Sequence, residues 1–326
     1  MRQRLTIKHH GERAHNQVVW INPLFRGHLP LALLKSGRRR TDSPLGVFSQ
    51  PDSKGLKLVQ FANKGSPDLC TSSRSAFVAS PIVFSDNRGN KYHWLNLKGC
   101  GRADLAREGR GIQLYLPGVH VPEYGIFETA YARHARRASQ ELLKAGVRIV
   151  PDLAHIRLHE HRAYESREMT SFPIDATLVV RAFGCRGRVV DIDNRRLLQE
   201  AIKVVRKENG YNMSRNDYAE WFAETLADSL ATMHSHGWIH GFLTDHNITL
   251  DARLNDFDSM SGIGDFKHTN HQEFEAKRQR DVRTAKKTLN GFLDRISPSN
   301  RIAYALFDDV YAAKYTVPRI IPKRVR

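Results

Sequence analysis

Two side chains in the second half of the chain could together hold a divalent cation. Asn247 and Asp256 lie nine residues apart in the stretch GWIHGFLTDHNITLDARLNDFDSM, residues 237–260. An amide oxygen and a carboxylate are hard oxygen ligands, which Mg²⁺ accepts together with water and nucleotide phosphates. A short strand pair between the two residues would bring Asp256 back beside Asn247. The pattern therefore predicts a magnesium site with Asn247 and Asp256 as its protein ligands.

The residue that usually acts as catalytic base beside such a metal pair is missing. In protein-kinase-type enzymes an Asp five residues before the metal-binding Asn accepts the proton of the substrate hydroxyl. Phe242 occupies that position here. General-base catalysis contributes roughly 10²–10⁴ in rate, so the sequence predicts either an inactive nucleotide-binding pseudokinase or a different reaction. Asp245 and His246 are the candidates for a replacement base.

Cationic residues upstream could bind phosphate groups. Residues 98–111, KGCGRADLAREGRG, combine four glycines with four Lys or Arg residues. Glycines let backbone N–H groups approach an anion, and the cations neutralise it. Taken alone, this composition is more typical of a charged flexible loop. Arg181 and Arg188 lie seven residues apart around a glycine-containing turn, so both could reach one anion.

The elements that must position these residues can be predicted from composition and periodicity. Residues 76–84 and 91–97 are rich in β-branched and aromatic residues and flank a turn-forming segment, which predicts an antiparallel hairpin with Lys98 at its exit. Residues 125–145 have helical periodicity and precede Gly146, a natural helix stop. Residues 147–161 predict a strand, a turn at Pro151-Asp152 and a second strand. Residues 176–183 predict a buried strand.

From Asn194 onward the sequence is mostly helical, with helices predicted at 197–210, 214–237 and 280–296. The fold class predicted is therefore α+β, a two-lobed protein-kinase-like fold with a β-rich N-lobe that carries one long helix and a mostly helical C-lobe. We predict an N-terminal extension packed on the N-lobe at residues 1–75, the N-lobe at 76–190 and the C-lobe at 191–326.

Composition limits the function classes. The chain has 326 residues, 40% of them hydrophobic, which is enough for two cores. No run of about 18 apolar residues occurs, so we expect no membrane span. Cys70, Cys100 and Cys185 are scattered, which favours a reducing, cytoplasmic setting. The net charge of +17 attracts polyanions. Nucleic acid is the less favoured partner, because the cations are spread along the chain without a recognised binding motif.

Several independent spacings together resemble the selenoprotein-O (YdiU-like) family of AMPylating pseudokinases over about residues 82–265. In that family the strand lysine begins a Lys-Gly-x-Gly-Arg segment that is followed by Arg-x-Gly-x-Gly, and both patterns occur here in residues 98–111. His240-Gly241, Asn247 and Asp256 are similar to the catalytic loop and its metal ligands. The resemblance implies these nucleotide-binding residues: Lys98, Gly99, Gly101, Arg102, Gly109, Arg110, Gly111, Glu128, Arg181 and Arg188.

The resemblance implies a protein adenylyltransferase that uses ATP and Mg²⁺, with Mn²⁺ as an alternative metal. ATP would bind in a flipped orientation with its γ-phosphate near Lys98, Arg181 and Arg188. AMP would then pass to a Ser, Thr or Tyr hydroxyl of a protein substrate. His246 stands where the family has Asp, so the base remains either Asp245 or His246. Glu128 or Glu141 would pair with Lys98. The other functions left open are an atypical phosphotransferase and an inactive Mg-ATP-binding scaffold.

Overall fold

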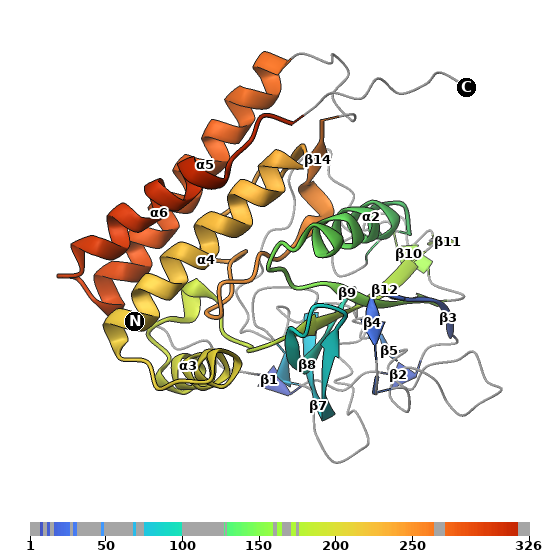
Figure 1. Ribbon diagram of the computed structural model, residues 1–326. Helices are drawn as coiled ribbons and strands as arrows, with labels where there is room; N and C mark the ends of the chain where they lie inside the picture. Colours follow the sequence, from blue (N-terminus) through green and yellow to red (C-terminus); the bar gives the residue numbers. More distant parts are fainter. Residues whose placement is uncertain are drawn as a thin grey trace. The chain divides into compact units, whose positions relative to one another are not determined.

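The computed structural model describes residues 7–8, 12–13, 16–26, 29–30, 47–48, 68–69, 75–99, 127, 129–158, 162–164, 171–173, 176–263 and 271–318. The chain divides into two compact units (Figure 1). The first comprises residues 1–87, 91–133 and 152–183, and the second comprises residues 88–90, 134–151 and 184–326. Among the described residues, no helix combines the length and the apolar character needed to cross a membrane.

The first unit is built on one antiparallel sheet. Its strands follow the order β1-β6-β7-β8-β12-β9-β3, and β4 pairs with β7. Two short strand pairs, β2–β5 and β10–β11, lie outside this sheet. The strands are β1 (Ile7–Lys8), β2 (Glu12–Arg13), β3 (Asn16–Ile21), β4 (Phe25–Arg26), β5 (Val47–Phe48), β6 (Asp68–Leu69), β7 (Ser75–Asp86), β8 (Lys91–Lys98), β9 (Asp152–Leu158), β10 (Arg162–Tyr164), β11 (Ser171–Pro173) and β12 (Ala176–Phe183).

The predicted hairpin and the predicted buried strand are both confirmed. Strands β7 and β8 pair in antiparallel register, with Ser75 opposite Lys98, and the register shifts between Ala79 and Phe84. Strand β12 lies between β8 and β9, and every one of its residues is buried. A strand with neighbours on both edges and no exposed residue reads as a continuous apolar run, which is why ATLVVRAF was recognisable.

The prediction for residues 147–161 was wrong in its first half. Asp152 does not belong to a turn but begins β9. Residues 147–151 form no strand, and only Ile149 makes an isolated bridge, to Leu254. The backbone explains this, because Val150 N donates to Leu254 O at 2.8 Å and Leu254 N donates to Arg148 O at 3.0 Å. Arg148, Ile149 and Val150 thus pair with the second half of the chain, whereas Val147 N still donates to the Leu142 carbonyl of the preceding helix at 3.0 Å.

Helix α2 (Thr129–Ala145) begins four residues later than the pattern predicts. Phe127 cannot belong to it, because its carbonyl oxygen accepts the backbone N–H of Thr177 in β12 at 2.8 Å. The predicted stop is confirmed, since Gly146 has a φ of +92°. Glycine adopts this left-handed conformation without steric cost, which ends the helix there.

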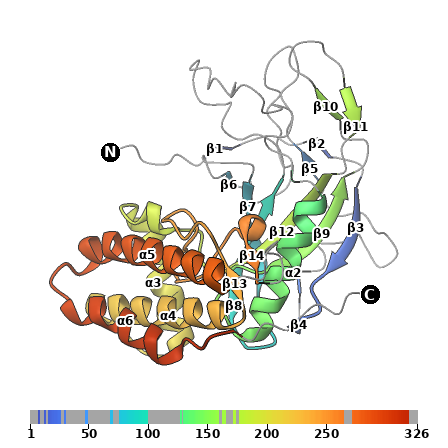
Figure 2. The same ribbon diagram turned by 90° about the horizontal axis from the view of Figure 1, so that it is seen from above.

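The second unit is mostly helical. Helices α4, α5 and α6 lie side by side in both ribbon views (Figures 1 and 2), and the Phe222 and Phe292 rings of α4 and α5 stack with centroids 3.9 Å apart. Helix α5 begins nine residues before the predicted start at residue 280. The elements are η3 (Val189–Asp191), α3 (Arg195–Asn209), α4 (Arg215–Ser235), β13 (Trp238–Ile239), η4 (Phe257–Ser259), β14 (Ser261–Gly262), α5 (His271–Ile296) and α6 (Arg301–Lys314).

Local capping explains where these helices begin and end. The Ser214 hydroxyl accepts the Asp217 N–H at 3.2 Å and the Asp217 carboxylate accepts the Ser214 N–H at 2.8 Å, which forms a capping box at the start of α4. Gly210 ends α3 with a φ of +75°. A β-rich unit followed by a mostly helical unit confirms the α+β class and the division into two parts predicted from the sequence, while the kinase-like arrangement of the two lobes stays a prediction.

Candidate active site

A short hairpin in the second unit brings the predicted metal ligands together. Ile248 and Leu254 form an antiparallel bridge, and Asn255 N donates to Asn247 O at 2.9 Å. Asp256 directly follows Asn255, so the two predicted ligands stand at the open end of the same hairpin. The strand pair predicted from ITL and ARLN is reduced to this one bridge, but the predicted return of the chain toward Asn247 is present.

Hydrogen bonding and backbone conformation orient the two side chains. The Asn247 Nδ2 group donates to the Phe242 carbonyl oxygen at 2.8 Å. This bond fixes the amide and commits its Nδ2 atom, so Oδ1 is the atom of this side chain that can act as a metal ligand. Asp256 has a φ of 75° and a ψ of 74°. A residue other than glycine held in the left-handed region stores strain, and such strain is concentrated at functional sites.

Asp281 of α5 anchors the start of the loop, and the sequence reading did not identify it. Its buried carboxylate accepts the backbone N–H groups of His240 at 2.7 Å and Gly241 at 2.9 Å. The buried His240 ring bonds to the Asn255 carbonyl at 2.8 Å through Nε2 and accepts the Phe242 N–H at 3.3 Å through Nδ1. The loop is therefore tied both to α5 and to the hairpin. The sequence did contain a signal for Asp281, because it is the one acid in the basic segment RQRDVR and lies at helical spacing from the apolar residues of the helix.

Arg188 lies against the same loop. It forms an antiparallel bridge with Thr249, and its Nη1 donates to the His246 carbonyl at 3.1 Å. The side chain is 6% exposed. Its buried Nε has no hydrogen-bond partner among the described residues. An unsatisfied buried donor costs about 1–3 kcal/mol, so this cation can bind an acceptor that the described residues do not supply.

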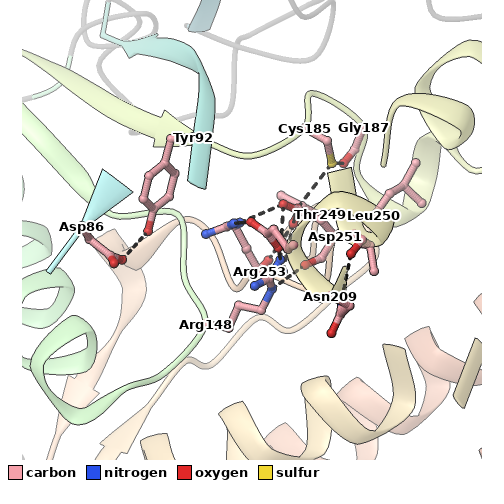
Figure 3. A network of polar contacts seen from close by, with 12 residues as sticks. Asp86, Tyr92, Arg148, Cys185, Gly187, Asn209, Thr249, Leu250, Asp251 and Arg253 are labelled. Atoms are coloured by element: carbon pink, nitrogen blue, oxygen red, sulfur yellow. Dashed lines mark hydrogen bonds and ion pairs between the residues drawn. The ribbon is translucent and has the colours of Figure 1, made fainter. Parts of the chain in front are cut away.

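Buried charged side chains of the hairpin and of neighbouring segments form one network of polar contacts (Figure 3). Arg253 is fully buried and donates from Nε to Asp251 Oδ2 at 2.8 Å and from Nη2 to Glu208 Oε1 at 2.9 Å. Arg148 donates to Glu208 Oε2 at 2.5 Å and to the Asp251 carbonyl at 2.8 Å. Two arginines and two carboxylates thus fix the hairpin segment between Asn247 and Asp256 to helix α3.

The electrostatics of this network follow from burial and charge. Burial alone would raise the pKa of Asp251, but Arg253 and Arg148 outweigh it and the pKa lies below its usual value. Burial raises the pKa of the Cys185 thiol, and Asp251 raises it further. The Cys185 Sγ lies 3.3 Å from Asp251 Oδ1 as a donor. Asp251 therefore remains ionised and Cys185 remains a thiol, which fits a structural role for both.

In the first unit, Lys98 and Arg181 come to one face of the sheet. Lys98 pairs with Val179, and Arg181 pairs with Asn96, so the two cations lie two positions apart across neighbouring strands. Residues two apart on a strand share a face. Both cations are buried, and the Arg181 Nη2 and Nε donate to Asn96 Oδ1 at 2.6 and 3.0 Å. The Lys98 Nζ stands 4.5 Å from the centre of the Phe127 ring.

Gly99, which follows Lys98, has both conformational and steric reasons to be glycine. Its φ is +91°, and a Cβ there would lie 2.9 Å from Phe127 Cβ and 3.0 Å from the Thr177 carbonyl oxygen. The close approach fixes the end of β8 against the segment that leads into α2. The other predicted phosphate-loop and lysine-pairing residues lie outside the described part of the chain: Gly101, Arg102, Gly109, Arg110, Gly111 and Glu128.

The remaining predicted residues have the following contacts. Glu141, the alternative partner of Lys98, accepts the Trp238 Nε1–H at 3.0 Å and the Arg137 Nε–H at 3.0 Å. Asp245 and His246 are about half exposed, with the His246 Nε2 atom 3.9 Å from Asp245 Oδ1. Phe242, at the usual base position, is 56% exposed. Within the described residues, no group of three or more His, Cys, Asp or Glu side chains is arranged to hold a metal ion.

Comparison with known proteins adds a fold likeness only. Neither a family model nor a curated protein sequence matches the chain. Among solved structures, the chain is similar to a kinase domain, that of a Toxoplasma gondii specific rhoptry antigen. The match has 11% sequence identity and a TM-score of 0.37, and it covers 78% of this chain and 77% of that chain. A likeness at this level identifies neither a family nor an activity.

Proposed function

We propose that the protein is an ATP-dependent adenylyltransferase that transfers AMP to a Ser, Thr or Tyr hydroxyl of a protein substrate. The observation that carries this proposal is the hairpin that holds Asn247 beside Asp256, with the buried Arg188 against the same loop. An oxygen-ligand pair next to an anion-binding cation is the arrangement expected for a metal–nucleotide complex.

The two ligands suit Mg²⁺, or Mn²⁺ in its place. Asn247 would contribute Oδ1, because its Nδ2 is committed to the Phe242 carbonyl. Asp256 would contribute its carboxylate. Two protein ligands are typical for Mg²⁺ at nucleotide sites, since phosphate oxygens and water complete its octahedron. When bound, the ion would neutralise phosphate charge and hold the triphosphate in one orientation.

The arginines supply the second part of the case. Arg188 has an unpartnered Nε within the described residues, and Arg181 presents a buried guanidinium on the sheet face that also carries Lys98. Guanidinium groups bind phosphate through paired N–H bonds. We infer that Arg181, Arg188 and Lys98 hold the β- and γ-phosphates, which would leave the α-phosphorus open to attack by the acceptor hydroxyl. The new bond joins that oxygen to the α-phosphorus, the bond between the α-phosphorus and the β-phosphate oxygen breaks, and pyrophosphate leaves.

The exposed Phe242 favours this reaction over ordinary phosphate transfer. It offers no carboxylate at the position where a kinase base accepts the hydroxyl proton. Asp245 and His246 are the groups that could accept that proton, and their exposure allows a substrate hydroxyl to approach. The cytoplasmic setting expected from the cysteines remains part of this proposal.

Paired assays with α-labelled and γ-labelled ATP test the proposal, with Mg²⁺ and a cell lysate as the source of acceptors. We expect label from the α position to appear on protein and to be lost in Asp256→Ala. Asp308→Ala is the matched control, because Asp308 is an exposed acid that pairs with Lys286 on the helices. Asp245→Ala and His246→Ala, compared with each other, identify the base.

Two outcomes would overturn the proposal in favour of the alternatives. Transfer of the γ label without the α label would make the protein an atypical phosphotransferase. Mg-ATP binding that depends on Asp256, without transfer of either label, would make it an inactive nucleotide-binding scaffold.

A further inference from the structure

The second unit contains a cavity of about 670 Å³ whose wall is strongly basic. Arg280, Arg283, Lys287 and Arg295 line it from helix α5, and Asp245 is the only acid among its lining residues. The volume falls in the range of sites for small ligands, about 300–1,000 Å³. The cavity therefore combines the size of a small-molecule site with an excess of positive charge.

The cations of α5 that face the cavity differ from those on the rest of the helix. Outside the cavity, Lys277 pairs with Glu273 at 3.0 Å and Lys286 pairs with Asp308 at 2.7 Å. Arg280, Arg283 and Lys287 have no ion pair or side-chain hydrogen bond in the described part of the chain. They are three and four residues apart, so they repel one another on a single helix face.

Like charges at this spacing destabilise a helix, and no acid lies three or four residues from Arg280, Arg283 or Lys287 along α5 to offset the repulsion. Arg295, by contrast, lies 3.6 Å from Asp193. The position of this face of α5 is fixed by a hydrogen bond, because the buried Thr288 hydroxyl donates to the Leu243 carbonyl at 3.0 Å. A cationic helix face that no described acid neutralises, held in a fixed position along the cavity, is suited to an anionic ligand from solution.

The shape of the site narrows the class of ligand. A nucleic acid duplex binds to a basic stripe that follows its backbone, with contacts spread over many phosphates. Here three cations that have no ion pair with any described residue line one cavity, which suits a compact molecule that carries several phosphates. Multiple phosphates also match the number of cations better than a single carboxylate does.

We propose that this cavity binds a compact, multiply phosphorylated small molecule through Arg280, Arg283 and Lys287. The site is distinct from the Asn247–Asp256 pair and does not rest on the proposed adenylyltransferase activity. Its ligand would lie against Asp245 and Thr244, in the loop that leads to Asn247. Occupation of the cavity could thus affect the proposed active site through this shared loop.

Isothermal titration calorimetry tests the proposal, with inositol hexakisphosphate as the probe and without ATP or divalent metal. We expect Arg283→Gln combined with Lys287→Gln to weaken binding at least ten-fold. The matched control is Lys277→Gln combined with Lys286→Gln, which removes the same charge from the same helix but outside the cavity. We expect this control to bind within two-fold of the wild type. Asp256→Ala should also bind normally, which separates this site from the nucleotide site.

Three results would overturn the proposal. The first is absence of measurable probe binding to the wild-type protein. The second is an equal loss of binding in both double variants, which would indicate diffuse attraction to the net charge. The third is a single-stranded oligonucleotide that binds more tightly than the probe and with the same preference for Arg283 and Lys287, which would make the ligand a nucleic acid. Circular dichroism of each variant excludes loss of folding as the cause.

Discussion

Removal of the Asp251 charge should destabilise the second unit strongly, although Asp251 is not a proposed ligand. The carboxylate is fully buried and accepts hydrogen bonds from Arg253 Nε at 2.8 Å and from the Thr249 hydroxyl at 2.5 Å. Asp251→Asn keeps the side-chain volume but leaves two arginines, Arg253 and Arg148, facing Glu208 alone. Breaking a buried ion pair by removal of one partner costs about 3–5 kcal/mol. We expect a loss near 3 kcal/mol, because Glu208 remains.

Urea unfolding followed by circular dichroism measures this loss. Asp308→Asn is the matched control, since it removes the same charge from an exposed pair with Lys286 whose acid side chain is 56% exposed. Exposed pairs contribute only about 0–1 kcal/mol. If Asp251→Asn costs no more than this control, the network does not hold the hairpin and the reasoning is refuted.

The same variant should change the response to acid. The folded-state pKa of Asp251 lies below its usual value of 3.8, because Arg253 and Arg148 outweigh the effect of burial. A depressed carboxylate pKa adds stability that is fully present above pH 3.8 and is lost as pH falls through the folded-state value. Acid titration of the wild type should therefore show a loss of stability below pH 3.8 that Asp251→Asn lacks.

Two further predictions concern the helical core and the sheet. Burial lowers the pKa of His234 below 6.5 despite its contact with Asp281. The neutral ring therefore favours the folded state above pH 6.5, and the free energy of unfolding should fall below that pH by up to about 1.4 kcal/mol per pH unit. Urea unfolding at pH 7.5 and 5.5 should show this slope, and an unchanged slope in His234→Gln would contradict the prediction. Gly99→Ala places a Cβ 2.9 Å from the Phe127 Cβ at a φ of +91°, and thermal unfolding should show a loss of stability of about 1–3 kcal/mol. Gly89→Ala is the control, because Gly89 has a φ of +85° but no atom within 4 Å of the added Cβ, and it should lose less stability. Equal losses in the two variants would show that the close approach to Phe127 does not matter.

The sequence predicted the elements whose signal is local. Strand β12 is buried throughout and reads as an apolar run, and the β7–β8 hairpin is marked by a turn segment rich in Asp, Asn and Gly. The hairpin between Asn247 and Asp256 was also predictable, because two residues of metal-ligand type flank two short strand-like segments in one stretch of sequence. Its relation to Arg188 followed only from the resemblance and not from any local pattern.

The parts that could not be predicted depend on contacts between distant residues. Strand β3 joins the sheet by pairing with β9, more than a hundred residues away, and nothing in NQVVWI announces that partner. The turn expected at Asp152 was wrong because residues 148–150 bond to Leu254. Asp281 was missed for the same reason, since its role lies in two backbone N–H groups forty residues upstream.

We infer that the buried charges around the loop serve to fix its geometry and not to stabilise the unit. A buried ion pair is often no more stabilising than apolar residues of the same volume, because the desolvation of each charge offsets the attraction. Yet Glu208 of α3 fixes the hairpin through Arg253, which also binds Asp251, and Asp281 of α5 fixes the start of the loop. Arg188 adds a third charged contact, to the carbonyl of His246. Three independent charged anchors on one loop of about twenty residues are explained if the relative positions of Asn247 and Asp256 must not vary. A metal–nucleotide site imposes that requirement, because Mg²⁺ tolerates little departure from octahedral geometry.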